Sequence, residues 1–313
     1  MIDRRMIFLA ALAVACIVAF MSIGLRGNPG FVLGLRAIRL TAMIEIGVAI
    51  AVSTVVFQTV TANRILTPSI MGIDALYLFA QIMLVFSLGG FFYATLDQRL
   101  KFSFEVAALM MLSLGLILPM LRARLDMGFM LLVGVVIGVL FRSLHSLIAR
   151  VIDPNDFAVA QVSSYATFND VKSELLVVAS LLTFASLAFV WRARHTLDIL
   201  ALGRDTAIGL GIDWTRTQVA CLLLVSVLVA VSTALVGPIA FLGLLVVALA
   251  ERIVGTRRHA VLIPAAALVA VIVLVGGQTL FQHVLGNSST LGVVVELAGG
   301  IVFLVLLWRR SRK

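Results

Sequence analysis

Five ionisable residues stand inside otherwise apolar stretches of the chain. They are Glu45, Asp74, Glu105, Arg142 and Glu296. A charged side chain at the centre of a bilayer costs roughly 2.5–3.5 kcal/mol on insertion scales, so such residues usually face protein or water. Each could line a polar pathway, pair with a neighbouring helix, or lie close to the boundary of its apolar stretch. The residues alone leave these three interpretations open.

Motifs that would support a covalent reaction or nucleotide binding are missing from the sequence. There is no Gly-x-x-x-x-Gly-Lys-Ser/Thr, and neither His-Glu-x-x-His, Cys-x-x-Cys nor Gly-x-Ser-x-Gly occurs. We therefore expect a chain that is not an enzyme, binds no ATP itself and holds no metal or other cofactor. The histidines and cysteines are too scattered to predict a metal site or a nucleophilic triad: His145, His195, His259, His283, Cys16 and Cys221.

Ten apolar stretches fill most of the 313 residues, and they must position any functional side chain. The chain is 62% hydrophobic with a mean hydropathy of +1.16, and about 20 apolar residues cross a bilayer. Continuous apolar runs indicate helices rather than the alternating pattern of a β-barrel. The sequence predicts an all-α membrane protein with one transmembrane domain over residues 1–313. The expected spans are residues 6–25, 41–61, 73–93, 102–120, 127–149, 171–191, 215–236, 239–254, 260–281 and 291–308.

The distribution of arginine and lysine predicts the orientation of these spans. With the N-terminus inside, sixteen basic residues fall on the inner side and seven on the outer side. Because basic residues are enriched in cytoplasmic loops, we expect both termini in the cytoplasm. The uncharged turns at Gly237-Pro238 and Gly286–Thr290 then fall outside. The net charge of +9 therefore reflects membrane orientation and contact with lipids, not nucleic-acid binding.

Two segments between spans are longer than a turn. Outside, Arg150–Val171 contains Asp153-Pro154, which favours a short helix with proline in its first position. Inside, Arg192–Arg216 has apolar residues at helical spacing, and the pattern predicts two short helices with a bend at Gly203. From the spacing alone, a plain surface hairpin between spans stays an alternative for the inner segment.

Five short segments, in order and at consistent spacing, carry a pattern seen in one family. They are Leu35–Leu40, Asn63–Ile73, Leu202–Asp213, Gly237–Leu244 and the last span with Gly299-Gly300. Together they resemble the permease subunits of bacterial ATP-binding-cassette importers for iron–siderophores and vitamin B12. The resemblance implies ten spans per subunit, a second permease subunit, two ATPase subunits and a periplasmic or lipid-tethered substrate-binding protein.

The first segment contains an arginine pair on the predicted outer side. In the family, arginines at this motif pair with glutamates of the docking binding protein, so the resemblance implies this role for Arg36 and Arg39. From the residues alone, they could equally extend toward lipid head groups. Ile38 and Arg64 stand where the family has prolines. Phe281–His283 stand where some members carry another outer arginine, and this departure points to weaker or asymmetric docking.

The inner segment matches the family's coupling region, which rests in a cleft of the ATPase. The matched positions are Leu202, Gly203, Ala207, Leu210 and Gly211. The resemblance implies that this loop transmits closure of the nucleotide-bound ATPase pair to the spans. ATP and magnesium would then bind the partner ATPase and not this chain.

The substrate expected from the resemblance is a ferric siderophore. The Gly299-Gly300 ending and the substituted first motif are typical of members that pair with a different permease, so a heterodimer is favoured over a homodimer. Vitamin B12 and haem are alternative substrates within the family. A secondary transporter driven by ions is an alternative from another class, and it would show an inverted repeat. The sequence does not name the siderophore.

Overall fold

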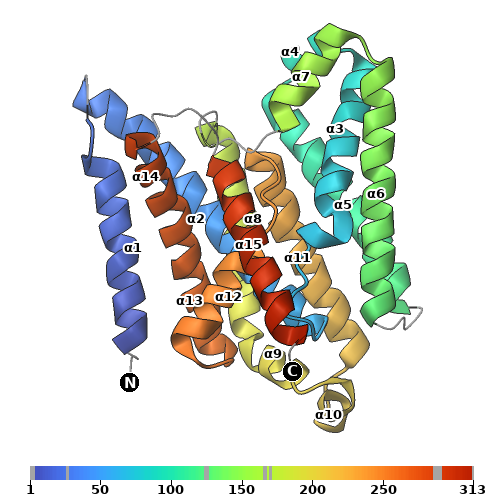
Figure 1. Ribbon diagram of the computed structural model, residues 1–313. Helices are drawn as coiled ribbons and strands as arrows, with labels where there is room; N and C mark the ends of the chain where they lie inside the picture. Colours follow the sequence, from blue (N-terminus) through green and yellow to red (C-terminus); the bar gives the residue numbers. More distant parts are fainter. Residues whose placement is uncertain are drawn as a thin grey trace.

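Long apolar helices run side by side between two ends of the bundle in the computed structural model (Figure 1). The structure describes residues 4–25, 28–122, 127–164, 168, 171–284 and 291–311. Within these ranges the regular elements are all helical. The principal helices are α1 (Arg4–Ser22), α2 (Pro29–Val60), α3 (Asp74–Leu88), α4 (Gly90–Thr95), α5 (Gln98–Arg122), α6 (Met127–Val151), α7 (Pro154–Ser164), α8 (Ser173–Arg192), α9 (Arg194–Leu200), α10 (Arg204–Gly209), α11 (Trp214–Val236), α12 (Leu242–Val254), α13 (His259–Val271), α14 (Gly277–Val284) and α15 (Leu291–Ser311).

Each predicted span overlaps one of these helices or a pair of them. Among the described residues, six stretches are long and apolar enough to cross a membrane, and Asp74–Leu88 is a shorter apolar helix. The largest difference is in α2, which begins at Pro29 rather than at residue 41. Asn28 caps it by accepting a hydrogen bond from the backbone N–H of Gly30, and proline occupies the first helical turn. The arginine pair therefore lies on the helix itself.

The core forms where α2, α11, α12 and α13 pack against one another. Small and β-branched residues fill this contact, and Ala51, Val225 and Ala266 have no exposed surface. In contrast, α1 and α8 present large apolar side chains outward, such as Phe8 and Phe184. This difference matches helices at the centre and at the lipid-facing edge of a membrane bundle.

Glycines end or bend the chain where the sequence predicted a turn. Gly237 has a φ of 102° and terminates α11, so the turn at Gly237-Pro238 is confirmed. After it, Phe241 adopts a left-handed φ of 60°, which is uncommon for a side chain of this size. A Cβ on Gly299 would overlap Phe241, so the glycine of α15 allows this loop to pack closely. The predicted turn at Gly286–Thr290 lies outside the described residues.

A small-residue contact also joins α6 to the π-helical turn η1 (Ser69–Ile73). Gly72 has a φ of 91°, and a Cβ on it would come within 2.9 Å of the Cα of Gly138. Gly134 and Gly138 are four residues apart on α6, and this pair of small residues is thus used in packing within the subunit.

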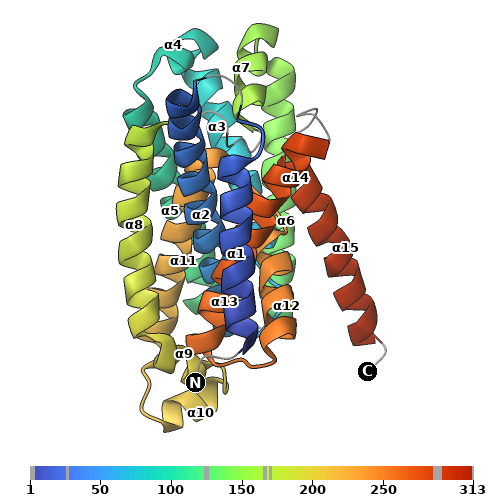
Figure 2. The ribbon, with the colours of Figure 1, turned by 90° about the vertical axis from the view of Figure 1, so that its left-hand side faces the viewer.

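The two ends of the bundle carry different short helices. The described ends of the chain lie at the same end of the bundle as α9 and α10, while α4 and α7 lie at the opposite end (Figures 1 and 2). Pro154 occupies the first position of α7, as predicted from Asp153-Pro154. α1 runs from the end with α9 and α10 to the other end (Figure 1). Because Arg36 bonds the last turn of α1, it lies at the opposite end of the molecule from the inner segment.

Candidate functional site

The outer arginine pair lies on α2 beside the end of α1, and its two members make different contacts. Arg36 donates from Nη1 to the carbonyls of Phe20 and Ile23, at 2.7 and 2.8 Å, and from Nη2 to that of Gly24 at 3.1 Å. These carbonyls belong to the last turn of α1 and the residues after it, where a cation is favourable. Arg36 therefore joins α1 to α2.

Arg39 lies one helical turn further along the same recess. The recess has a volume of about 540 Å³ and is lined by Arg36, Arg39, Gln282 and His283, together with apolar residues of α1 and α2. Within the described part of the chain, Arg39 makes no hydrogen bond or ion pair with another residue. Its guanidinium is available to a ligand or partner, whereas most of the donors of Arg36 are already used.

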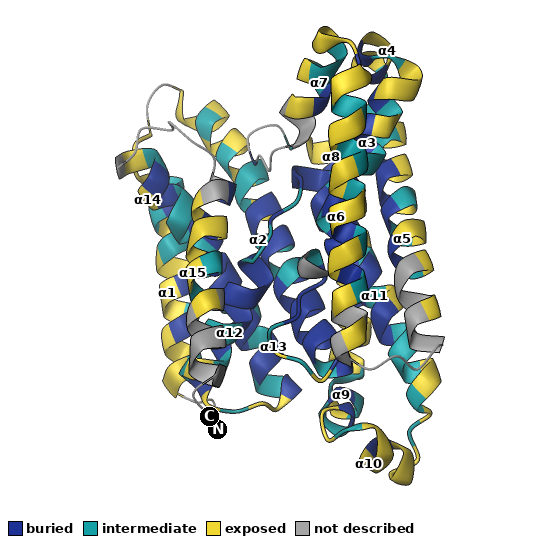
Figure 3. Ribbon diagram, turned by 45° about the vertical axis from the view of Figure 1, so that its right-hand side comes forward, coloured by how far each residue is buried: buried dark blue, intermediate teal, exposed yellow. Residues whose placement is uncertain are grey.

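The inner segment forms two short helices, α9 and α10, with a bend between them as predicted. Gly203 has a φ of 99° and immediately precedes α10, and Gly211 has a φ of 84° beyond its end. Ala207 is fully buried, while Leu202 and Leu210 are 61% and 59% exposed. The two leucines therefore place apolar surface on either side of α10, which projects from the end of the bundle (Figure 3).

Unlike α10, the first helix of this segment is held in the bundle. Leu197 and Leu200 of α9 are buried, and α9 contacts α2 and α13. Asp198 accepts hydrogen bonds from the backbone N–H and the ring Nδ1 of His259, at 2.8 and 2.7 Å. Burial raises the pKa of the Asp198 carboxyl, but these hydrogen bonds and the charges of His259 and His195 hold that pKa below its usual value.

His259 is a residue that sequence reasoning missed, because the four histidines were treated only as scattered. Its partners lie 61 and 200 residues away in the sequence. Two features of the sequence could have indicated its role. His259 stands at the start of an apolar span, directly after Arg257 and Arg258, and Asp198 is an acidic residue of the inner segment that could pair with it.

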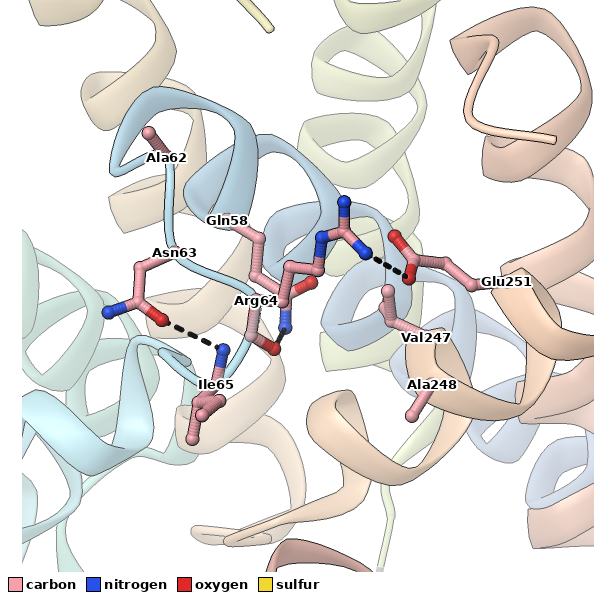
Figure 4. A pocket seen from close by; sticks show the side chains of 8 residues that line it. All are labelled: Gln58, Ala62, Asn63, Arg64, Ile65, Val247, Ala248 and Glu251. Carbon is pink, nitrogen blue, oxygen red and sulfur yellow. Dashed lines mark hydrogen bonds and ion pairs between the residues drawn. The ribbon is translucent and has the colours of Figure 1, made fainter. Parts of the chain in front are cut away.

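A cavity of about 420 Å³ lies between the end of α2 and α12 (Figure 4). Gln58 donates to the carbonyl of Arg64 at 2.7 Å, and Asn63 accepts from the backbone N–H of Ile65 at 3.1 Å. The side chain of Arg64 reaches Glu251, with 3.8 Å between Nη1 and Oε2. The Asn63–Ile73 motif thus begins with a polar loop that lines a cavity near the inner end.

Two of the ionisable residues within spans join helices. Glu45 of α2 accepts hydrogen bonds from Ser180 and Thr183 of α8, at 2.6 and 3.2 Å. Glu105 of α5 accepts one from Tyr93 of α4 at 3.2 Å. Glu45 and Glu105 therefore pair with a neighbouring helix, which is one of the three roles considered for the ionisable residues within spans.

Of the other three ionisable residues, Arg142 and Glu296 both lie within electrostatic range of Asp74 at the start of α3. Asp74 accepts a hydrogen bond from Ser69 and interacts electrostatically with Arg142 of α6 and Glu296 of α15. Glu296 also accepts a hydrogen bond from the backbone N–H of Ala240. Acidic and basic groups are thus brought together from distant parts of the sequence.

Comparison with models of protein families identifies the family of this chain. The model of the FecCD transport family matches residues 6–309. The chain belongs to the FecCD transport family. This membership confirms the resemblance drawn from the five sequence segments.

Relatives within the FecCD family extend along almost the whole chain. The petrobactin import permease YclO of Bacillus subtilis (strain 168) is 40% identical over 99% of this chain and 98% of its own length. The petrobactin import permease FatC of Bacillus anthracis is 29% identical over 90% of this chain and 81% of its own length. The ferric enterobactin permease FepD of Escherichia coli (strain K12) is 28% identical, over 90% and 83%.

A solved structure has the same fold. It is described as an inward-facing conformation of a metal-chelate type ABC transporter, and it superposes with a TM-score of 0.82 over 97% of this chain and 98% of its own. At 21% identity, this likeness shows the arrangement of helices and not the substrate. The chain is a multi-pass membrane protein of the FecCD fold.

Proposed function

We propose that this chain is the membrane-spanning permease subunit of an ATP-binding-cassette importer for a ferric siderophore, of the class to which petrobactin belongs. The observation that carries the proposal is the 40% identity to a petrobactin import permease over nearly the full length of both chains. A vitamin B12 permease of Vibrio cholerae is also related, but at 28% identity and over 88% of this chain. Siderophore is therefore favoured over vitamin B12 and haem.

In this proposal the bundle crosses the inner membrane ten times, with both termini in the cytoplasm. The helices that overlap the predicted spans, and the sixteen-to-seven distribution of basic residues, support this topology. The chain performs no covalent chemistry. ATP and magnesium bind a pair of partner ATPase subunits, whose closure drives alternation between outward- and inward-facing states.

The two ends would bind different partners. Leu202 and Leu210, on either side of α10, are exposed apolar side chains at the end that we place in the cytoplasm, where an ATPase groove would bury them. At the other end, Arg39 is available to a carboxylate of the substrate-binding protein. Arg36 supports that surface by holding α1 against α2.

A second permease subunit would cover the face that α6 and α15 flank. Both helices present exposed residues on this side, with buried residues of the core between them (Figure 3). Val136 and Val139 of α6 and Leu297 and Ile301 of α15 are exposed apolar side chains of these two helices. We expect a similar but different permease there, which makes the transporter a heterodimer in the membrane.

Reconstitution tests the proposed function. Liposomes would contain this chain together with the second permease and the ATPase subunits of the same transporter. A substrate-binding protein loaded with radiolabelled ferric petrobactin would be added to the side that corresponds to the outer face. We expect uptake that requires ATP and the binding protein. Uptake driven by an ion gradient without the ATPase, or a preference for vitamin B12 or haem, would overturn the proposal.

A further inference from the structure

A buried histidine at the start of α13 connects three helices near the coupling segment. His259 is only 2% exposed, yet both of its ring nitrogens have partners. Nδ1 lies 2.7 Å from Oδ1 of Asp198 in α9, and Nε2 lies 2.8 Å from Oγ1 of Thr59 in α2. The backbone N–H of His259 donates to the same carboxylate oxygen at 2.8 Å.

Both contacts of the His259 ring tie it to another helix. The Asp198 carboxylate has no hydrogen to donate, so Nδ1 of His259 donates to it. The Thr59 hydroxyl can donate as well as accept, and it lies 2.8 Å from both Nε2 of His259 and the carbonyl of Val55, so the bond to Nε2 forms whichever of the two groups donates. Hydrogen bonds to an ionised carboxylate are about twice as strong as neutral ones.

The cluster fixes α9, and α9 is directly connected to α10, the helix that projects from the bundle. On α9, Leu197 and Leu200 are buried on either side of Asp198 in sequence. Asp198 also accepts from the first N–H of α13, where a negative charge is favourable. The first helix of the segment is thus held to α2 and α13, while α10 projects outward beyond the bend at Gly203.

We infer that His259 is a positioning residue for coupling. Its ring ties α9 to α2 and α13, so a displacement imposed on α10 by the ATPase moves these spans instead of sliding α9 along the bundle. Asp198 and Thr59 are its two partners in this role. This inference rests on the proposed function, because it needs the inner segment to receive the motion of an ATPase.

Thr59→Val tests the link with almost no change in side-chain shape, and Thr61→Val is its matched control. Thr61 also lies at the end of α2 and its hydroxyl also donates to a carbonyl four residues earlier, at 2.7 Å, but the structure gives it no contact with His259. The complex would be reconstituted with its ATPase and binding protein, and substrate uptake would be measured per ATP hydrolysed. We expect Thr59→Val to lower this ratio roughly threefold or more, and Thr61→Val to leave it unchanged.

Asp198 provides a second pair of variants. Asp198→Asn keeps an oxygen that accepts from the backbone and ring of His259, whereas Asp198→Ala removes it. We expect Asp198→Ala to uncouple hydrolysis from uptake, with Asp198→Asn between it and the wild type. Thr59→Val combined with Asp198→Asn should show less than the sum of the single effects, because both act on one ring.

The outcomes separate this inference from the proposed function. If the wild-type complex neither binds an ATPase nor transports, the proposed function fails. If the wild type couples normally, and Thr59→Val and Asp198→Ala retain its uptake per ATP, then His259 has no positioning role. Equal losses in Thr59→Val and Thr61→Val, accompanied by equal losses of membrane-inserted protein, would show a purely structural contribution and would also overturn the inference.

Discussion

The two ends of the bundle present opposite kinds of surface. At the outer end the member of the arginine pair without a partner in the described chain is a half-buried cation, Arg39, beside a recess. At the inner end the exposed residues on either side of α10 are leucines, Leu202 and Leu210. Rim charges mainly steer association and set orientation, whereas buried apolar area stabilises a complex. The difference predicts a rapidly exchanging partner outside and a persistent one inside.

The ends also share one arrangement, in which a side chain bonded to other helices supports a residue that is left for a partner. Arg36 donates to three carbonyls at the end of α1, and His259 joins α9 to two longer helices. In both places the supporting side chain makes its hydrogen bonds within the protein, and the side chain of a residue close to it in the chain or on the surface has none within the described ranges. Changes to these two kinds of residue should therefore have different consequences.

The largest effect should follow from changes at the bend and apolar surface of the inner segment. A β-branched side chain is strained at the φ of 99° found at Gly203, so Gly203→Val should displace α10. Leu210→Asp should remove an apolar anchor. We expect each variant to insert in the membrane but to lose at least about tenfold in ATPase retention and uptake, measured on the purified complex.

Gly115→Val is the control for this experiment. Gly115 lies in α5, outside the inner segment, has no positive φ, and has open space around the position of a Cβ. The variant should behave as the wild type does. Normal assembly and transport by both Gly203→Val and Leu210→Asp would show that this loop is not the coupling segment.

These two ends also show what the sequence can and cannot predict. The bend at Gly203, the turn at Gly237 and the start of α7 at Pro154 were predicted, because glycine and proline act on the backbone locally. The contacts of Arg36 and His259 were not, since their partners come from other helices. The sequence placed Arg36 and Arg39 together as a docking pair, and only the packing of α1 against α2 distinguishes them.

The next largest effect should be on stability, through Arg36. Arg36→Ala removes three hydrogen bonds from a charged donor and leaves carbonyls at the end of α1 without this partner. We expect a loss of about 1–3 kcal/mol in unfolding free energy. Thermal unfolding of the detergent-solubilised protein measures it, with Arg39→Ala as the control. An equal loss in both variants would contradict the separate roles.

A smaller effect, on kinetics, is expected at Arg39. Arg39→Glu should replace attraction by repulsion toward an acidic surface of the binding protein, and slow its association several-fold at low ionic strength. The difference from the wild type should shrink as salt is raised, because exposed charges are screened. Stopped-flow association with liposome-embedded transporter would measure both. A rate that responds to Arg36→Lys but not to Arg39→Glu would reverse the assignment.

The smallest effect is expected at the ion pair beside the inner cavity. Arg64 and Glu251 are 3.8 Å apart, and 51% of the Arg64 side chain is exposed, so water screens much of their attraction. Arg64→Gln should change stability by no more than about 1 kcal/mol. Because Gln58 bonds the backbone carbonyl of residue 64 rather than its side chain, the loop should keep its shape and uptake should stay near the wild-type rate. A large loss of uptake without loss of stability would instead identify this pair as a contact that changes during transport, and the inner end would then contain a second element that responds to the ATPase.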